Sequence, residues 1–249
     1  MISFKYVSIV VASLLALSAC SSTSNTTPAA AAPAHVRYVE GAPQLQADVN
    51  GTPVSLGVGA YLQAGSQTVV SGFYYGTISS FQDLSPTVRT LTARSIQGYT
   101  VGPLKLPALA SGKNYSLVVV GSYPNSQVLA FEEPAASSEA RLSLYEASPS
   151  VQHASFGSFT YIGTSKTNFK TLGNASFGNV ATVSLGASVS NFGGFAGPAS
   201  KPIDALPLAD VDPNDVKGVL PFHNGARLSL FLFDPGGTSA GPVFGTLDP

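Results

Sequence analysis

The clearest reactive group in the sequence is its single cysteine, Cys20, which follows Leu17, Ser18 and Ala19. An aliphatic residue, two small residues and a cysteine form a bacterial lipobox. In such a pattern the thiol is alkylated by a diacylglyceryl group, and cleavage before the cysteine frees an amine that is usually acylated as well. Two or three acyl chains, at about 0.8 kcal/mol per buried CH₂, give a stable membrane anchor where one chain does not. The pattern therefore predicts lipidation at Cys20.

The three histidines, His35, His153 and His223, are the candidate general bases. They lie far apart in the sequence, although a catalytic triad is defined by geometry and can assemble from distant segments. No Ser-x-x-Lys motif accompanies them. We interpret them as surface histidines. The alternative is a hydrolase that uses His153 or His223 as its base.

The alternating oxygen-bearing side chains Asp210, Asp212 and Asn214 are the candidate metal ligands. Ca²⁺-binding loops place such side chains at their first, third and fifth positions. The sixth position, which requires glycine, is Asp215, and the twelfth, which supplies a bidentate glutamate, is Pro221. Aspartate and asparagine also stabilise turns by bonding to nearby backbone groups. We therefore favour a solvated turn over a weak Ca²⁺ site, and we predict neither a cofactor nor a catalytic residue.

The adjacent carboxylates Glu132 and Glu133 cannot form an acid–base pair on a strand, because neighbouring side chains there point to opposite faces. They open a stretch of polar and small residues, 132–138, that is typical of a linker.

Two aromatic clusters, at 73–75 and 156–161, could stack on a sugar or a peptide. The sequence lacks Trp, the preferred ring for sugar stacking, so core packing is the favoured interpretation. Phe156 shares a strand face with the later rings of its cluster only if Gly157 forms a bulge.

Residues 1–19 have the features of a secretory signal: Lys5 is the positive charge, and residues 7–17 are a short apolar core. This core is shorter than the roughly 18 residues that span a bilayer as a helix. Residues 20–34, rich in Ser, Thr, Ala and Pro, predict a disordered tether. Ser21, in place of aspartate, resembles the outer-membrane sorting pattern of double-membraned bacteria. We expect an extracytoplasmic protein that its lipid anchors to a bacterial membrane.

Composition excludes several classes of function. Charged residues make up 10% of the chain, against about 25% in an average soluble domain. The net charge of −1 lacks the basic surface that nucleic-acid binding requires. A single cysteine excludes an internal disulfide framework and a cysteine-rich metal site.

From residue 35 onward the sequence predicts an all-β protein, because short runs rich in Val, Tyr, Phe and Thr alternate with Gly, Pro and Asn. Asn50-Gly51 predicts a type I′ hairpin turn. Pro53, just after this turn, must occupy a position that donates no ladder hydrogen bond. The apolar runs 115–120 and 228–233 predict central strands that are covered on both faces.

A loose internal repeat aligns residues 35–43 with residues 140–149, since both contain Arg and Glu and end in small residues and a proline. Weaker echoes follow in the same order in both halves. The repeat predicts two tandem Ig-like antiparallel β-sandwich domains, 35–135 and 139–249, of which the second is a diverged repeat. The alternative is one elongated sandwich or barrel built from both halves.

Three segments of the first half resemble a known family. They are 36–43 (VRYVEGAP), 48–51 (DVNG) and 112–121 (GKNYSLVVVG). They are similar to the Val-Arg-Val-Val-His-Ala-Ser-Pro opener, the Asp-Val-Tyr-Val-Asn-Gly hairpin and the Gly-Lys-x-Tyr strand of the bacterial and archaeal extracellular family called Domain of Unknown Function 4397. Both openers have Glu where the family has His, and the second half lacks the Asn-Gly hairpin. The resemblance implies a secreted, tandem, sandwich-like surface protein and supplies no catalytic residues.

These features predict a membrane-anchored extracytoplasmic lipoprotein that acts as a non-enzymatic structural, adhesive or ligand-binding module. Its expected partners are the membrane, through the lipid, and an envelope glycan or protein, with no nucleic acid. The alternative function is a secreted hydrolase acting on glycan or peptide.

Overall fold

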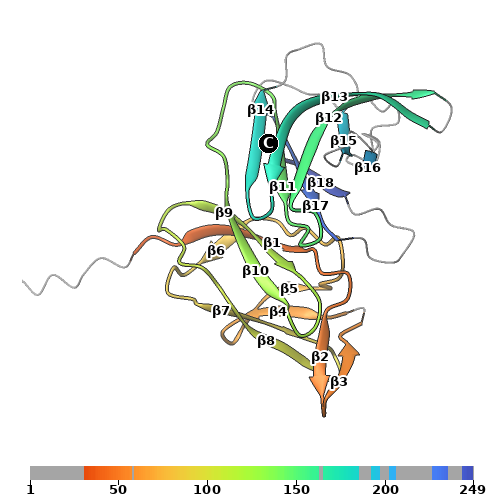
Figure 1. Ribbon diagram of the computed structural model, residues 1–249. Helices are drawn as coiled ribbons and strands as arrows, with labels where there is room; N and C mark the ends of the chain where they lie inside the picture. Colours follow the sequence, from red (N-terminus) through yellow and green to blue (C-terminus); the bar gives the residue numbers. More distant parts are fainter. Residues whose placement is uncertain are drawn as a thin grey trace, which may run out of the picture. The chain divides into compact units, whose positions relative to one another are not determined.

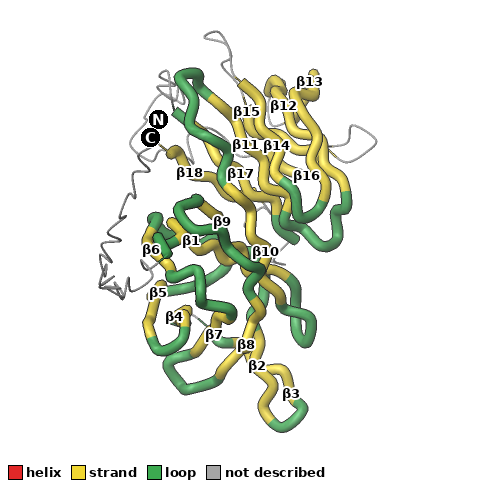
Figure 2. The backbone as a smooth tube through the Cα atoms, turned by 90° about the vertical axis from the view of Figure 1, so that its left-hand side faces the viewer, coloured by secondary structure: helices red, strands yellow, loops and turns green. Residues whose placement is uncertain are grey.

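Every element of the described chain is a β-strand (Figures 1 and 2). The computed structural model describes the backbone of residues 31–57, 59–162, 165–184, 192–196, 202–205, 226–234 and 243–248. Within these ranges no helix is long and apolar enough to cross a membrane. The predicted all-β class is confirmed.

The first half of the chain forms two four-stranded sheets and a separate hairpin. The first sheet, in the order β10-β9-β1-β6, consists of β10 (Gln127–Glu132), β9 (Asn114–Val120), β1 (Ala34–Glu40) and β6 (Gln82–Leu84). The second sheet, in the order β5-β4-β7-β8, consists of β5 (Gln67–Ser71), β4 (Tyr61–Ala64), β7 (Thr90–Arg94) and β8 (Thr100–Lys105). The hairpin pairs β2 (Gln46–Val49) with β3 (Thr52–Ser55).

The hairpin turn has the predicted conformation. Asn50 and Gly51 have φ values of 54° and 80°, as a type I′ turn requires. The Gly51 N–H donates to Oδ1 of Asp48 over 2.6 Å. Pro53 faces Asp48, one pair beyond the residues that close the turn, where an antiparallel ladder needs no donor.

The second half forms two more four-stranded sheets. One, in the order β14-β11-β17-β18, consists of β14 (Val180–Ser184), β11 (Arg141–Glu146), β17 (Arg227–Leu232) and β18 (Val243–Asp248). The other, in the order β13-β12-β15-β16, consists of β13 (Ser165–Ser176), β12 (His153–Ile162), β15 (Phe192–Ala196) and β16 (Pro202–Ala205). The register of β12 shifts between Phe156 and Gly157, where a bulge was the condition for Phe156 to share a strand face with the later rings.

The two halves repeat one strand arrangement. β1 lies parallel to β9 and antiparallel to β6, and β11 lies parallel to β17 and antiparallel to β14. Glu40 pairs with Val119 and Glu146 with Leu232 at the same end of these parallel ladders. The parallel pairs differ from the antiparallel arrangement that we expected. They arise because the first strand of each half pairs with a strand reached only after the chain has crossed through other strands.

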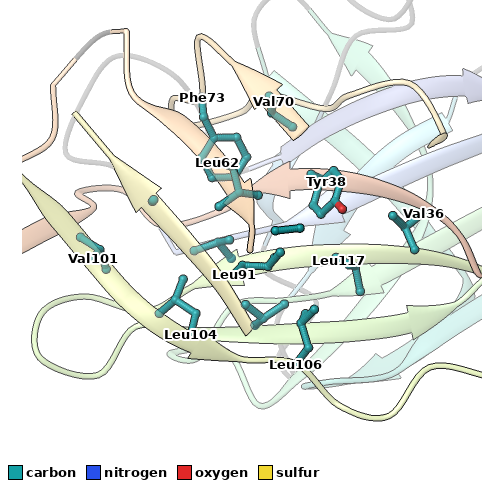
Figure 3. Packing of buried hydrophobic residues seen from close by; sticks show 14 of the residues in the cluster. Val36, Tyr38, Leu62, Val70, Phe73, Leu91, Val101, Leu104, Leu106 and Leu117 are labelled. Carbon is teal, nitrogen blue, oxygen red and sulfur yellow. The ribbon is translucent and has the colours of Figure 1, made fainter. Parts of the chain in front are cut away.

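The sheet that contains β1 and β9 is buried on both faces. Val36 and Tyr38 of β1 pack into the core of the first half, with Leu62, Leu91 and other residues of the sheet around β4 (Figure 3). The alternate residue Val39 belongs to a different apolar cluster. β9 and β17 are buried almost throughout, so the prediction that 115–120 and 228–233 are doubly covered strands is confirmed.

The second cluster joins the two halves, which belong to one compact unit beginning at Ala31. The first half contributes Val39, Val118, Val120 and Phe131, and the second half contributes Tyr145, Ala147, Phe231 and Phe233. The rings of Tyr145 and Phe231 stack with centroids 4.4 Å apart. Gly41 has no room for a side chain, because a Cβ there would lie 2.5 Å from Cδ1 of Phe233.

A buried guanidinium lies in the same interface. Arg37 is 1% exposed, and its Nη1 donates to Oδ1 of Asp248 over 2.7 Å. Its Nη2 bonds to Glu133 at 3.2 Å and to the Ser229 hydroxyl at 3.1 Å, and its Nε bonds to Ser116 at 2.6 Å. One side chain of the first half is therefore held by two residues of the second.

The charges of this cluster balance, because Arg227 adds a second cation to the two carboxylates. Its Nη2 lies 2.8 Å from Oε2 of Glu133 and 3.0 Å from Oδ2 of Asp248. The Ser116 hydroxyl donates to Glu133, and the Ser229 hydroxyl donates to Asp248. The two serines occupy equivalent positions in the parallel ladders of the two halves, where Ser116 pairs with Arg37 and Ser229 with Ser143. The buried ions thus have the partners that make their burial tolerable.

We predict that Arg37→Met lowers the free energy of unfolding by about 3–5 kcal/mol, since it leaves two buried carboxylates with one cation. Arg141→Met is the matched control, because Arg141 bonds only through Nη1 to the carbonyl of Ala135 at an exposed position. Urea denaturation followed by circular dichroism measures both values. Adding Glu133→Gln to Arg37→Met should recover part of the loss; a single-variant loss below about 1 kcal/mol would contradict this account.

Candidate functional site

Several predicted site residues lie outside the described part of the chain. These are Cys20, His223, Asp210, Asp212 and Asn214. The lipidation site and the weak Ca²⁺ candidate therefore stay predictions. Among the described residues no group of three or more His, Cys, Asp or Glu side chains is arranged to hold a metal ion.

The two described histidines are exposed and occupy different places. His35 stacks on Phe81 with ring centroids 5.4 Å apart, and its Nδ1 lies 3.0 Å from Oδ1 of Asp83. His153 faces Ser176 across the β12–β13 ladder, with Nδ1 2.9 Å from the hydroxyl oxygen. A nucleophile and base need a third group that orients the base. No carboxylate bonds to His153 within the described residues, so this pair is a cross-strand surface contact.

The two adjacent glutamates, Glu132 and Glu133, point to opposite faces, as expected. Only Glu132 is exposed to solvent, as a linker residue would be. Glu132 is exposed and forms an ion pair with Lys113 at 3.0 Å. The Glu133 side chain is 1% exposed and binds both Arg37 and Arg227. Interpreting Glu133 as a linker residue was wrong, because its partners come from distant strands.

The chain also contains a Gly-x-Ser-x-Gly pattern. Residues 237–241 (GTSAG) match the Gly-x-Ser-x-Gly elbow of α/β-hydrolases and lie outside the described residues. That elbow joins a strand to a helix. Here the nearest described elements on either side are β17 and β18, two strands that pair with each other. Because neither of these described neighbours is a helix, the match at Ser239 stays a sequence pattern outside the described residues.

A cavity of about 340 Å³ opens at one end of the first half's core. Aromatic and aliphatic side chains predominate in its wall, and the hairpin strand β3, the segment after β1 and the loop after β5 all contribute. The lining residues are Glu40, Ala42, Pro43, Gln44, Leu45, Ser55, Leu56, Gly57, Ala60, Phe73, Tyr74 and Tyr75. A volume above roughly 300 Å³ lies in the range of small-molecule sites.

Glu40 is the one acidic or basic residue in this wall. It is the last residue of β1 and shares the inward face with Val36 and Tyr38, because side chains alternate along a strand. The Ala42 N–H donates to its Oε1 over 2.8 Å. Its Oε2 is buried and has no hydrogen-bond partner among the described residues. One oxygen of the carboxyl group therefore stabilises the turn, and the other forms no hydrogen bond with the described residues.

Burial raises the pKa of the Glu40 carboxyl well above its usual value, and the Ala42 N–H only partly opposes this shift. The group is 1% exposed and forms no ion pair among the described residues. Burial therefore favours the uncharged form of this carboxyl group.

Glu146 is the equivalent residue of the second half. Its Oε1 accepts from the Ser148 N–H over 3.0 Å, and its Oε2 likewise has no partner among the described residues. Burial, and secondarily the negative charge of Asp234, raise the pKa of Glu146 to about 8. Asp234 in turn accepts from the hydroxyls of Ser148 and Ser150 at 2.5 and 2.6 Å.

The sequence signal that could have found these two glutamates is the repeat itself. Both sit at the end of the opening strand, where alternation directs the side chain into a core.

Neither a scan against protein-family models nor a search of the curated proteins finds a match to this chain.

The raised pKa values predict that the protein loses stability as pH rises. The folded state keeps the Glu146 proton up to about pH 8, whereas the unfolded chain releases it near the ordinary glutamate pKa of 4.5. The free energy of unfolding should therefore fall between about pH 5 and 8, by a few kcal/mol, and level off above pH 9.

Glu146→Gln should flatten this slope, and Glu40→Gln with Glu146→Gln should flatten it further, since both carboxyls act in the same direction. Thermal unfolding measured at intervals from pH 5 to 9 tests this. Glu132→Gln, at an exposed position, is the control and should keep the wild-type slope. A wild-type stability that rises over this interval would exclude the assignment.

Proposed function

We propose that this protein is a lipid-anchored, extracytoplasmic and non-enzymatic ligand-binding module, built from two tandem Ig-like sandwiches. The single observation that supports binding is the cavity beside Glu40. It combines an apolar, aromatic wall with a volume in the range of small-molecule sites.

The tandem arrangement is supported by the repeated order of β6-β1-β9-β10 and β14-β11-β17-β18. The motifs at 36–43, 48–51 and 112–121 support membership of the Domain of Unknown Function 4397 family. The lipobox at Cys20 supports the anchor, and the segment 20–34 supports a tether that spaces the folded part from the membrane.

The anchor is tested with Cys20→Ser in the host bacterium. We expect the wild-type chain to incorporate a fatty-acid probe and to yield a mature N-terminus at Cys20 with the mass of the added acyl groups. The variant should incorporate no probe and remain unprocessed. An unmodified thiol at Cys20, or a mature N-terminus elsewhere, would refute the anchor.

The cavity is tested with arrays of envelope glycans and peptides, using the full chain in lipid nanodiscs. Ala60→Leu fills the cavity from inside, and Ser55→Trp adds bulk at an exposed lining position without changing the core. Both variants should lower wild-type binding at least tenfold. The control Ser138→Trp, at an exposed position outside the wall of this cavity, should bind normally. Binding that is unchanged in both cavity variants would argue against this site.

A further inference from the structure

A second cavity, of about 330 Å³, lies beside the β2–β3 hairpin and shares no lining residue with the cavity beside Glu40. Three segments form it: β2, the strand β8 that lies alongside it, and the loop between β9 and β10 (Figures 1 and 2). Each polar side chain of its wall is exposed or half-buried, so a ligand in solvent can reach them all. These side chains are Gln46, Asp48, Thr100, Tyr123 and Ser126.

The Asp48 carboxylate is held in place by two donors. Its Oδ1 accepts from the Gly51 N–H over 2.6 Å, and its Oδ2 accepts from the Tyr123 hydroxyl over 2.9 Å. The hydrogen bond to Asp48 raises the pKa of the Tyr123 phenol, which therefore keeps its proton at neutral pH. Since a carboxylate has about four acceptor positions, about two remain for the donors of a ligand.

The loop that carries Tyr123 is tightly closed. Gly121 has a φ of 88°, and a Cβ there would lie 2.6 Å from the carbonyl oxygen of Asn125. The Asn125 N–H in turn donates to the carbonyl of Ser122 over 2.6 Å. These contacts hold the phenol over Asp48 before any ligand arrives. A preorganised pair loses less conformational entropy when a ligand binds.

The charges of the wall exclude one class of ligand and disfavour another. Asp48 is its one charged residue, and no Lys, Arg or His lines it. An anion would therefore meet no cation and would be repelled by the carboxylate. A simple cation would use Asp48 alone and would leave the amide of Gln46 and the hydroxyls of Thr100 and Ser126 without a partner in the ligand. The wall therefore favours a neutral ligand with several polar groups.

Three rings complete the wall. They belong to Tyr123, which lies outside both aromatic clusters of the sequence, and to the exposed prolines Pro103 and Pro124. A sugar ring combines hydroxyls, which both donate and accept hydrogen bonds, with apolar C–H faces that pack on such rings.

We infer that this second cavity binds a neutral sugar residue of a glycan, whose hydroxyls donate to Asp48 and bond to the other polar side chains of the wall. The volume of the cavity lies in the range of small-molecule sites. This inference goes beyond the function proposed above, because it assigns a separate site with its own class of ligand.

Trisaccharides of different charge test the ligand class. The neutral probes are chitotriose, maltotriose and mannotriose. The charged probes are trigalacturonate, an anion, and the chitosan trimer, which is chitotriose without its acetyl groups and is cationic at pH 6. Isothermal titration uses the full chain in nanodiscs at pH 6, with empty nanodiscs subtracted. We expect at least one neutral probe to bind at least tenfold more tightly than both charged probes.

Two variants test the site, each with a matched control. Ser126→Trp fills the cavity, and Tyr123→Phe keeps the ring but removes the hydroxyl that holds Asp48. Both should weaken binding of the neutral probe about tenfold or more, the loss expected for one hydrogen bond to a charged group. Ser138→Trp and Tyr61→Phe, which lie outside both cavities, should bind as the wild type does. Thermal melts check that each variant is folded.

The outcomes separate this site from the cavity beside Glu40. Absence of binding by every neutral probe, or tighter binding of the chitosan trimer, would overturn the assignment of a neutral sugar. Sugar binding that is lost in Ala60→Leu but kept in Ser126→Trp and Tyr123→Phe would place the sugar in the cavity beside Glu40 and overturn the second site. Conversely, sugar binding that depends on Ser126 and Tyr123 supports the second site even if the cavity beside Glu40 binds nothing.

Discussion

The buried guanidinium of Arg37 is the constraint on which the arrangement of the two halves depends. A charge that is 1% exposed is stable only when its donors all find acceptors, and here the acceptors come from both halves. The rings of Phe81, Tyr145 and Phe231 lie 4.9, 5.7 and 5.3 Å from its central carbon, which adds cation–π attraction. Sliding one central sheet against the other by a single residue pair would separate Arg37 from Asp248. The ion cluster therefore adds to the close apolar contacts, such as that of Gly41 with Phe233, in fixing the register of the interface.

This constraint explains why the central strands β1, β9, β11 and β17 are buried on both faces. One face of each contributes to its own half's core, and the other meets the opposite sheet. Serine hydroxyls occupy matching positions in β9 and β17, where larger side chains would separate Arg37 from the carboxylates. Because the first strand of each half is enclosed in this way, its last residue, Glu40 or Glu146, is held inside a core while the chain turns away.

The sequence predicted what depends on local pattern. The all-β class, the turn at Asn50-Gly51 and the doubly covered strands follow from alternation and turn chemistry. It did not predict the role of Arg37, whose partners lie 79 to 211 residues away. Glu133 was wrongly interpreted as a linker residue for the same reason, because the polar and small residues around it in the sequence are typical of a linker, whereas its partners are distant. Glu40 was noted only as a departure from a family motif, because the cavity beside it is assembled from segments up to 35 residues later.

The equivalence of Glu40 and Glu146 also shows how one fold position acquires two environments. Register places Gly121 of the first half where the second half has Asp234. Asp234 binds Ser148 and Ser150 and adds negative charge beside Glu146, so that carboxyl is surrounded by its own chain. Gly121 has no side chain that could bond to the segment after Glu40. That segment continues into Pro43 and the β2–β3 hairpin, which form one wall of the cavity. The repeat thus supplies the buried acid in both halves, and the residues that differ between them surround Glu146 with its own chain and leave a cavity beside Glu40.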